Sequence, residues 1–200
     1  MTGAKPRAGR FLEIKDGTMN KAIGGVELSS VARGLEAADA MLKTSEVGLL
    51  LSRTICPGKY IVLVSGDTAA VNAAVSAGAE KASQALTDSF VVPNIHPDVF
   101  PAIAGTAAAG ELEALGVIEA FSVPALIEAA DAAVKAAPVR LLEIRLAMAL
   151  GGKAFVTMTG PVAAAEAAVA AGAAVAAKKG LLTEKVVIPR PRQELLGEMI

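Results

Sequence analysis

The chain has 200 residues, of which 54% are hydrophobic and 20% are charged, and its formal net charge is −1. This composition supports a buried core and excludes a chain that is disordered throughout. The chain has no basic surplus, no Trp and one Tyr, so neither phosphate neutralisation nor base stacking is indicated, and we expect no nucleic-acid partner.

No apolar run reaches the roughly 20 residues that a membrane-spanning helix requires, so we expect no membrane partner. The single cysteine, Cys56, excludes an intrachain disulfide and fits a reducing cytoplasm. Residues 1–20 are polar and basic and lack the apolar stretch of a secretory signal, so we interpret them as a flexible N-terminal extension of a cytoplasmic protein.

After this extension, hydrophobic patterning predicts a first domain over residues 21–93. Its predicted elements alternate between short apolar runs, typical of strands, and longer segments with helical spacing. Strands are expected over 22–29, 47–55, 60–65 and 90–92, and helices over 31–43 and 69–84. The turn signal Cys56-Pro57-Gly58 joins the second and third strands into a hairpin.

A linker over residues 94–111 follows, with Pro97 and Pro101, and leads to a second domain over residues 112–200. In this domain the same patterning predicts strands over 114–121, 139–147, 154–159 and 185–188 and helices over 123–135 and 162–178. Both halves therefore have the order β-α-β-β-α-β, a ferredoxin-like two-layer unit of the mixed α/β (α+β) class.

The two halves are copies of each other. With a shift of 92, residues 22–53 align with residues 114–145 and share 15 identities in 32 positions. With a shift of 94, residues 58–79 align with residues 152–173 and share 12 identities in 22. The shift changes because the second copy has two extra residues before its Gly-Lys pair, and the match indicates a tandem duplication.

Three segments of the duplicated unit resemble the signatures of the bacterial microcompartment (BMC) shell domain. They are Ala22-Ile23-Gly24-Gly25-Val26-Glu27, the segment Glu36-Ala37-Ala38-Asp39-Ala40-Met41-Leu42-Lys43, and Val187-Ile188-Pro189-Arg190-Pro191. Both copies begin with the Ala-x-Gly strand, which is the unpermuted arrangement. The resemblance covers about residues 21–198, and several motifs repeated in order make it specific.

This resemblance implies a homotrimer whose six domains imitate the hexamer of single-domain members. Such pseudohexamers pack edge to edge with other shell proteins into a shell that encloses enzymes. A pore on the symmetry axis is lined by the loops between the second and third strands of each domain. Here the implied lining residues are Thr54, Ile55, Cys56, Pro57, Gly58, Ala149, Leu150, Gly151 and Gly152.

The loop from Ser52 to Lys59 further resembles the tandem-domain shell proteins of propanediol-utilisation compartments, the T-type subgroup. That subgroup implies a [4Fe-4S] cluster at the pore, one per trimer, held by Cys56 of each subunit. Three thiolates would hold three irons of the cubane and leave the fourth open. Electrons or cluster components could then pass between the cytoplasm and the lumen, with an encapsulated redox enzyme as the expected partner.

The residues alone leave other interpretations of Cys56 open. A lone cysteine is most often a small buried hydrophobe, and no Cys-x-x-Cys partner exists. Zinc held by three cysteines and water is a weaker alternative to iron. A metal-free pore that conducts small metabolites is the main alternative, and a ligand-binding sensor is a third. Lys59 would favour the thiolate only if its side chain points toward Cys56.

Lys43 and Lys135 end equivalent helices, where a cation is favoured by the helix dipole. The family resemblance implies that both lie at the tile edge and contact a neighbouring tile, together with Arg190. The first copy has Asn94 in place of Arg190, so alternate edges should differ.

An enzymatic role is not expected. The single histidine, His96, cannot supply several catalytic sets, and no phosphate-binding glycine loop of the Gly-x-x-x-x-Gly-Lys type occurs. Glu27 and Glu119 form a pair only because the domain is duplicated.

Overall fold

The computed structural model describes residues 22–108, 110–148 and 150–195. The predicted N-terminal extension, the predicted pore residue Ala149 and the last five residues of the second domain lie outside the described residues.

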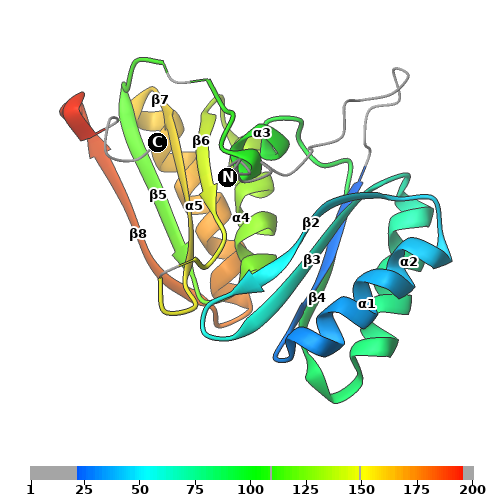
Figure 1. The fold of residues 1–200 in the computed structure, drawn as a ribbon. Helices are drawn as coiled ribbons and strands as arrows, with labels where there is room; N and C mark the ends of the chain where they lie inside the picture. The colour runs from blue at the N-terminus through cyan, green and yellow to red at the C-terminus, as the bar shows by residue number, and fades with distance from the viewer. Residues whose placement is uncertain (1–21, 109, 149, 196–200) are drawn as a thin grey trace, which may run out of the picture.

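The first domain has the predicted order of elements (Figure 1). They are β1 (Ala22–Leu28), α1 (Val31–Thr44), β2 (Gly48–Ile55), β3 (Lys59–Gly66), α2 (Thr68–Ala82) and β4 (Leu86–Pro93), with the short 3-10 helix η1 (Ser83–Ala85) before β4. The four strands form an antiparallel sheet in the order β2-β3-β1-β4.

The second domain repeats this architecture, so the prediction of two unpermuted copies is confirmed. Its elements are β5 (Ala114–Ala120), α4 (Val123–Ala136), β6 (Arg140–Arg145), β7 (Ala154–Gly160), α5 (Val162–Lys178) and β8 (Leu182–Pro189). Its antiparallel sheet has the order β6-β7-β5-β8. The linker holds a further short helix, α3 (Val99–Ala104), which the sequence patterning did not predict.

Equivalent serines start the first helix of each domain. The Oγ of Ser30 accepts a hydrogen bond from the N–H of Arg33, and the Oγ of Ser122 accepts one from the N–H of Ala125. Each serine thus satisfies one of the four N–H groups that a helix start leaves without a partner. The same local signal therefore fixes where α1 and α4 begin.

The last strand of each domain is longer than the apolar pattern predicted. Polar residues such as Asp88 and Ser89 interrupt the hydrophobic run, yet both pair with β1 along the ladder. The same holds for β8, which pairs with β5 from Leu182 to Pro189. Backbone pairing to a central strand, and not burial of side chains, extends these strands.

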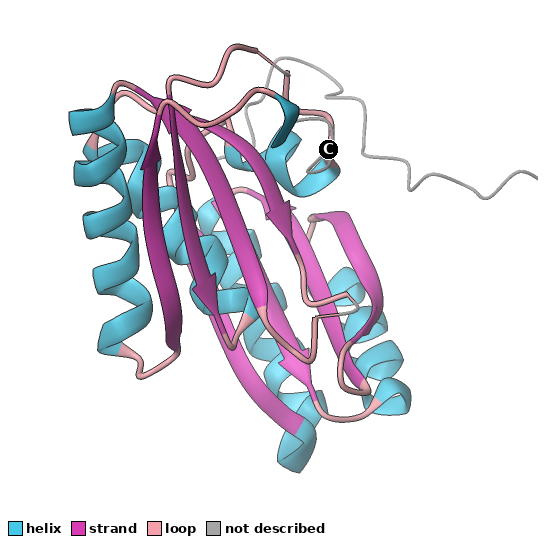
Figure 2. Cartoon of the chain, turned by 90° about the vertical axis from the view of Figure 1, so that its left-hand side faces the viewer, coloured by secondary structure: helices cyan, strands magenta, loops and turns pink. Residues whose placement is uncertain are grey.

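The strands of the first domain bury both faces of their sheet. Alternate residues such as Val62 and Val64 pack on the domain's own helices, whereas Ile61 and Leu63 belong to a larger core shared with the second domain. Because side chains alternate along a strand, this division follows from the period of two. Helix α4 covers the second face of the first sheet, and it packs against β1 and β4 (Figures 1 and 2).

Candidate functional site

The predicted pore loop of the first domain is a tight turn at the tip of the β2–β3 hairpin. Thr54 and Ile55 end β2, and the turn consists of Cys56, Pro57 and Gly58. The N–H of Gly58 donates to the carbonyl oxygen of Ile55 over 3.1 Å. The φ of Gly58 is +83°, a conformation that favours glycine, so this residue lets the chain reverse.

The predicted pore loop of the second domain is wider and also relies on glycine. Gly151 and Gly152 have φ values of +60° and +91°. The N–H of Lys153 donates to the carbonyl oxygen of Leu150 over 3.1 Å and closes the turn before β7.

The two loops contact each other within one chain. The N–H of Cys56 donates to the carbonyl oxygen of Ala147 over 2.8 Å. A methyl group on Gly152 would lie 3.1 Å from Cδ of Pro57, so the two turns are in close approach. The structure therefore brings the described residues of both predicted pore loops together, although 92 residues or more separate equivalent positions in the sequence.

Cys56 is half-buried at this meeting point. Within residues 22–108, 110–148 and 150–195, no group of three or more His, Cys, Asp or Glu side chains could hold a metal ion. A cluster at Cys56 therefore requires cysteines from other copies of the chain.

Lys59, the basic residue that follows the Cys56 turn, has a carboxylate partner in the structure. Its Nζ lies 2.6 Å from Oε1 of Glu27 in an ion pair, and Glu27 is only 1% exposed. The second carboxylate oxygen of Glu27 accepts a hydrogen bond of 3.1 Å from the N–H of Val123, at the start of α4. Glu27 thus joins the β3 strand of its own domain to the first helix of the second domain.

Two further hydrogen bonds cross the same boundary between the domains. Oγ of Ser122 donates to Oδ2 of Asp88 over 2.9 Å, and the N–H of His96 donates to Oδ1 of Asp131 over 2.8 Å. We call this boundary the domain joint. It consists of α4 with its N-cap Ser122 on one side and of Glu27, Asp88 and His96, from the first domain and the linker, on the other. Sequence reasoning assigned no role to its residues, because the duplication by itself explained the pair of Glu27 and Glu119.

Within the described residues the domain joint forms once, although the helix and the last strand that make it have an equivalent in the other domain. Helix α4 buries its outer face, whereas the equivalent face of α1 is open: Ile127 is 0% exposed, and its counterpart Leu35 is 57% exposed. Likewise β4 is covered and β8 is not: Phe90 is 5% exposed, and its counterpart Val186 is 44% exposed. The chain therefore carries one completed joint and the two unmatched halves of another.

Glu119, the counterpart of Glu27, occupies one of these unmatched halves. Its carboxylate lies 3.3 Å from Nζ of Lys153, and its side chain is 33% exposed. The residue equivalent to Val123 is Val31, whose backbone begins the open helix α1 in the same chain.

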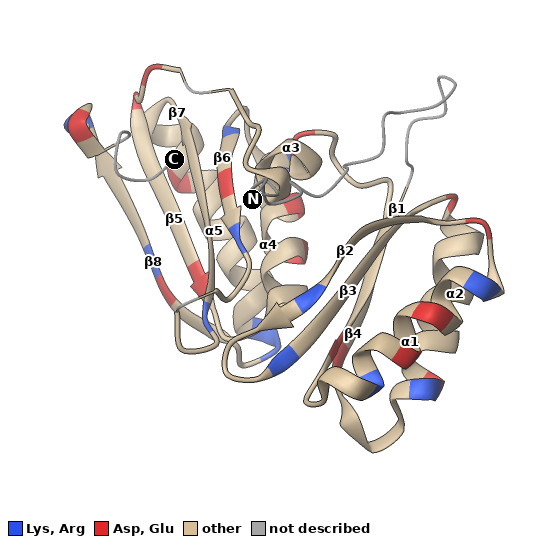
Figure 3. Cartoon of the chain, viewed as in Figure 1, with Lys and Arg blue, Asp and Glu red and all other residues tan. Residues whose placement is uncertain are grey.

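The predicted edge residues lie at the ends of three different elements, α1, α4 and β8. Lys43 and Lys135 are in the last turns of α1 and α4, and each is paired with the aspartate one turn earlier, at 2.7 and 2.6 Å. Figure 3 shows the acidic and basic residues along α1, which belongs to the outer layer of the first domain. Arg190 is exposed just after β8, and its N–H donates to the carbonyl oxygen of Glu113 over 3.1 Å.

Asn94 occupies the same backbone position as Arg190. Their φ values are +50° and +48°, and each residue follows the last strand of its domain. The two copies thus present different side chains on one backbone conformation.

None of the helices in the described parts of the chain has the length and apolar content to cross a membrane.

Comparison with known protein families matches the BMC domain twice, over residues 22–95 and 114–191. The chain is similar to the bacterial microcompartment shell protein PduT of Citrobacter freundii, with 44% identity over 182 residues that cover 91% of this chain and 99% of PduT. It is also similar to the carboxysome shell protein CsoS1 of Prochlorococcus marinus (strain MIT 9313), with 40% identity over 89 residues that cover 43% of this chain and 86% of CsoS1.

Among solved structures, the chain is similar to a microcompartment protein from Desulfitobacterium hafniense DCB. The TM-score is 0.83 at 51% sequence identity, and the match covers 88% of this chain and 98% of that one. The similarity therefore extends over both copies of the domain.

Proposed function

The chain belongs to the BMC-domain family of bacterial microcompartment shell proteins, and from this premise we propose that three copies form a ring whose pore holds a [4Fe-4S] cluster through Cys56. As a family member, the protein is a structural tile of the shell that surrounds a microcompartment in the cytoplasm, and it is not an enzyme. Its partners include other shell proteins. The trimer, the cluster and a redox enzyme as a further partner are the proposed parts.

The observation that carries the ring is the pair of unmatched halves of the domain joint. The open face of α1, with Leu35, is equivalent to the face of α4 that β4 covers. The open face of β8, with Val186, is equivalent to the face of β4 that packs on α4. Docking β8 of one chain on α1 of the next repeats the joint already made inside the chain. Such a head-to-tail contact forms a ring if the rotation closes, and six domains make that ring a trimer of this chain.

Charged groups at the unmatched halves support the same arrangement. Glu119 would accept a hydrogen bond from the N–H of Val31 of the next chain, as Glu27 accepts one from Val123. Glu184 pairs with Glu119 along the sheet as Asp88 pairs with Glu27, so it would face Ser30 of the next chain. Each acceptor would thus meet the helix start that its counterpart meets within the chain.

A three-fold ring supplies what one chain lacks for a cluster. One cysteine per chain becomes three thiolates on the axis, and thiolates are the usual ligands of iron–sulfur clusters. Cys56 suits this position because it lies at the tip of a hairpin whose turn is braced by Gly58 and by the bond to Ala147. When bound, such a cluster accepts and donates single electrons. The second loop offers no such ligand among its described residues, since Leu150, Gly151 and Gly152 have no side-chain donor.

The test is the content of iron and acid-labile sulfide per trimer after anaerobic purification, with EPR and visible absorption spectra. We expect about four irons per trimer in the wild type and none in Cys56→Ser. Thr54→Ser on the same hairpin is the matched control and should keep the iron. An iron-free trimer that also resists anaerobic reconstitution would exclude the cluster and favour a metal-free pore for small metabolites, with Cys56 as a lining residue.

A further inference from the structure

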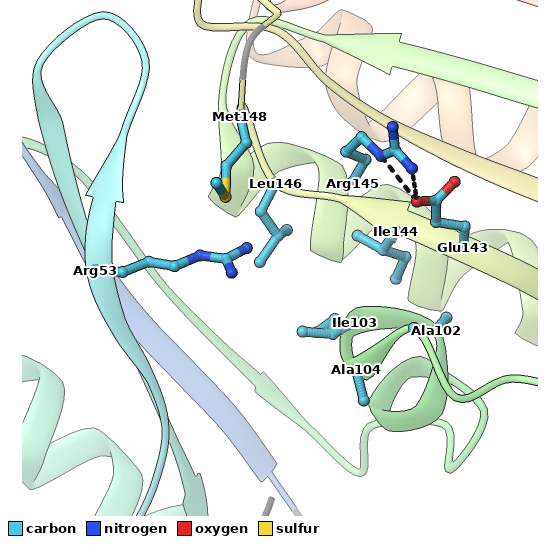
Figure 4. Close-up of a pocket in the computed structure, with 10 residues that line it drawn as sticks. Arg53, Ala102, Ile103, Ala104, Glu143, Ile144, Arg145, Leu146 and Met148 are labelled. Atoms are coloured by element: carbon cyan, nitrogen blue, oxygen red, sulfur yellow. Dashed lines mark hydrogen bonds and ion pairs between the residues drawn. The ribbon is translucent and has the colours of Figure 1, made fainter. Parts of the chain in front are cut away.

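A pocket of about 330 Å³ lies between the two domains, next to the contact of Cys56 with Ala147. Strand β2 forms one side, the end of β6 and the residues after it form the other, and α3 of the linker closes the base (Figure 4). Its volume is at the lower end of the range for small-molecule sites in proteins.

Arg53 of β2 extends its guanidinium across this pocket toward Leu146 (Figure 4). Among the residues that the structure describes, the side chain of Arg53 makes no ion pair and no hydrogen bond, whereas its backbone pairs with β3. Partial burial lowers the pKa of Arg53 from its ordinary value, because burial disfavours the charged form. A bound anion would offset this unfavourable desolvation.

The equivalent arginine of the second domain has an acidic partner that Arg53 lacks. Arg145, its equivalent in β6, lies 2.6 Å from Oε1 of Glu143 in an ion pair. The first domain has Leu51 at the position that corresponds to Glu143. The second copy therefore neutralises its own arginine, whereas the first leaves one positive charge facing the pocket. Figure 3 shows basic residues on both strands, β2 and β6, and an acidic residue on β6.

The rest of the pocket wall is mainly apolar. Ile103 of α3 and Ile144, Leu146 and Met148 of the second domain line it (Figure 4). Apolar walls favour an alkyl group over a fully hydrated ion. One uncompensated guanidinium favours a single negative charge, and the ion pair of Glu143 and Arg145 adds no net charge.

We propose that this pocket binds a small aliphatic monocarboxylate, with its carboxylate on Arg53 and its alkyl chain against Ile103, Leu146 and Met148. A guanidinium suits this task because its planar donors match the two oxygens of a carboxylate. The site lies within one chain and needs neither the proposed cluster nor a partner's residues. The inference therefore goes beyond the proposed function, and either can fail without the other.

The test is isothermal titration of the assembled protein with butyrate, with inorganic phosphate, acetate and 1-butanol as comparison probes. We expect saturable binding of butyrate, and weaker binding of acetate and 1-butanol, because one lacks most of the alkyl chain and the other lacks the charge. Arg53→Gln should weaken butyrate binding about tenfold or more, since a hydrogen bond to a charged group is lost. Arg53→Lys should keep part of the affinity.

Arg33→Gln is the matched control, because Arg33 is an exposed arginine already paired with Glu36 at 2.6 Å. It should leave butyrate binding unchanged. Absence of saturable butyrate binding, equal binding of phosphate, or an affinity that Arg53→Gln does not change would each overturn the proposal. Thermal unfolding of each variant separates loss of the site from loss of the fold.

Discussion

The N–H of Cys56 and the carbonyl oxygen of Ala147 are 2.8 Å apart, and this hydrogen bond connects the hairpin tip of one domain to the corresponding loop of the other. This hydrogen bond fixes the position of one loop relative to the other within a single chain. The conformation of either loop should therefore depend on the other.

Gly152→Ala should destabilise the chain more than Gly151→Ala. Both glycines have positive φ, so alanine is strained at either position by about 1–2 kcal/mol. Only at Gly152 would the added methyl group lie 3.1 Å from Pro57, whereas nothing lies within 4 Å at Gly151. Urea unfolding measures the two losses of free energy, and equal losses would show that the loop contact contributes nothing.

Glu27→Gln should cost about 2–3 kcal/mol of stability, because it removes the carboxylate charge from a buried pair and leaves Lys59 without its counter-ion. The matched variant Glu119→Gln should cost less than about 1 kcal/mol in the dissociated chain, where its carboxylate is partly solvated. Chemical unfolding at low protein concentration makes the comparison. If Glu119→Gln proved as costly as Glu27→Gln in the monomer, the assignment of Glu27 to the domain joint would be wrong.

Leu35→Glu should leave the chain folded and prevent ring formation. The side chain is exposed in one chain, so the monomer tolerates a charge there, but it would be buried against β8 of the next chain in the proposed ring. Ser76→Glu is the control, since Ser76 and its counterpart Ala170 are both exposed. Light scattering after size exclusion gives the masses, and a Leu35→Glu trimer would refute this docking surface.

The double variant Lys43→Ala with Lys135→Ala should form rings that no longer join into sheets. Both lysines lie in the last turns of helices, and Lys43 is largely exposed. Lys135 is paired with Asp131, which also accepts the hydrogen bond from His96 at the domain joint, so thermal unfolding must first show that the double variant keeps its fold. The control replaces Lys81 and Lys178, which end α2 and α5. Electron microscopy of the purified protein reports sheet formation, and normal sheets from the first double variant would remove both lysines from the tile edge.

Gly172→Ala should destabilise the second domain by about 1–3 kcal/mol, because its methyl group would lie 2.5 Å from the carbonyl oxygen of Ala129. The equivalent Gly78→Ala should cost less, since its methyl group meets the side chain of Met41, which can rotate, and not a backbone atom. The helix preference for alanine, about 1 kcal/mol, applies to both variants. The measurement is thermal and urea unfolding of the pair. Identical effects would mean that the backbone of α4 can move away as easily as a methionine side chain.

Repetition made most of the fold predictable from the sequence. The same order of hydrophobic patterns in both halves predicts the same helices and strands in each domain. Ser30 and Ser122 mark the starts of equivalent helices. The strands β4 and β8 were predicted too short because backbone pairing to a central strand leaves no hydrophobic signal at Asp88 or Glu184. Helix α3 was missed because six residues with a proline inside are too few for a periodic pattern.

The site was only partly predictable. The glycines and Pro57 identified the two loops, but no local signal shows that Cys56 meets Ala147. Glu27 and Glu119 are the same residue type at equivalent positions of the two copies. Only the tertiary structure shows that Glu27 is buried in the domain joint and that Glu119 is partly exposed. The alignment of the two copies places Leu51 opposite Glu143. Only the structure shows that this difference leaves Arg53 without an acidic partner at the pocket between the domains.

The completed joint within each chain has a consequence for how a ring can assemble. A ring of six separate domains must close six contacts between independent bodies, whereas three linked pairs must close only three. Each covalent link replaces a bimolecular encounter by an intramolecular one, whose effective concentration lies in the millimolar range for short flexible connections. In the proposed ring the link also fixes the order of neighbours, so the loop with Cys56 would alternate with the loop that has no cysteine. A mutation in one loop would then change every second position around the proposed axis, and the two sets of three loops could evolve independently.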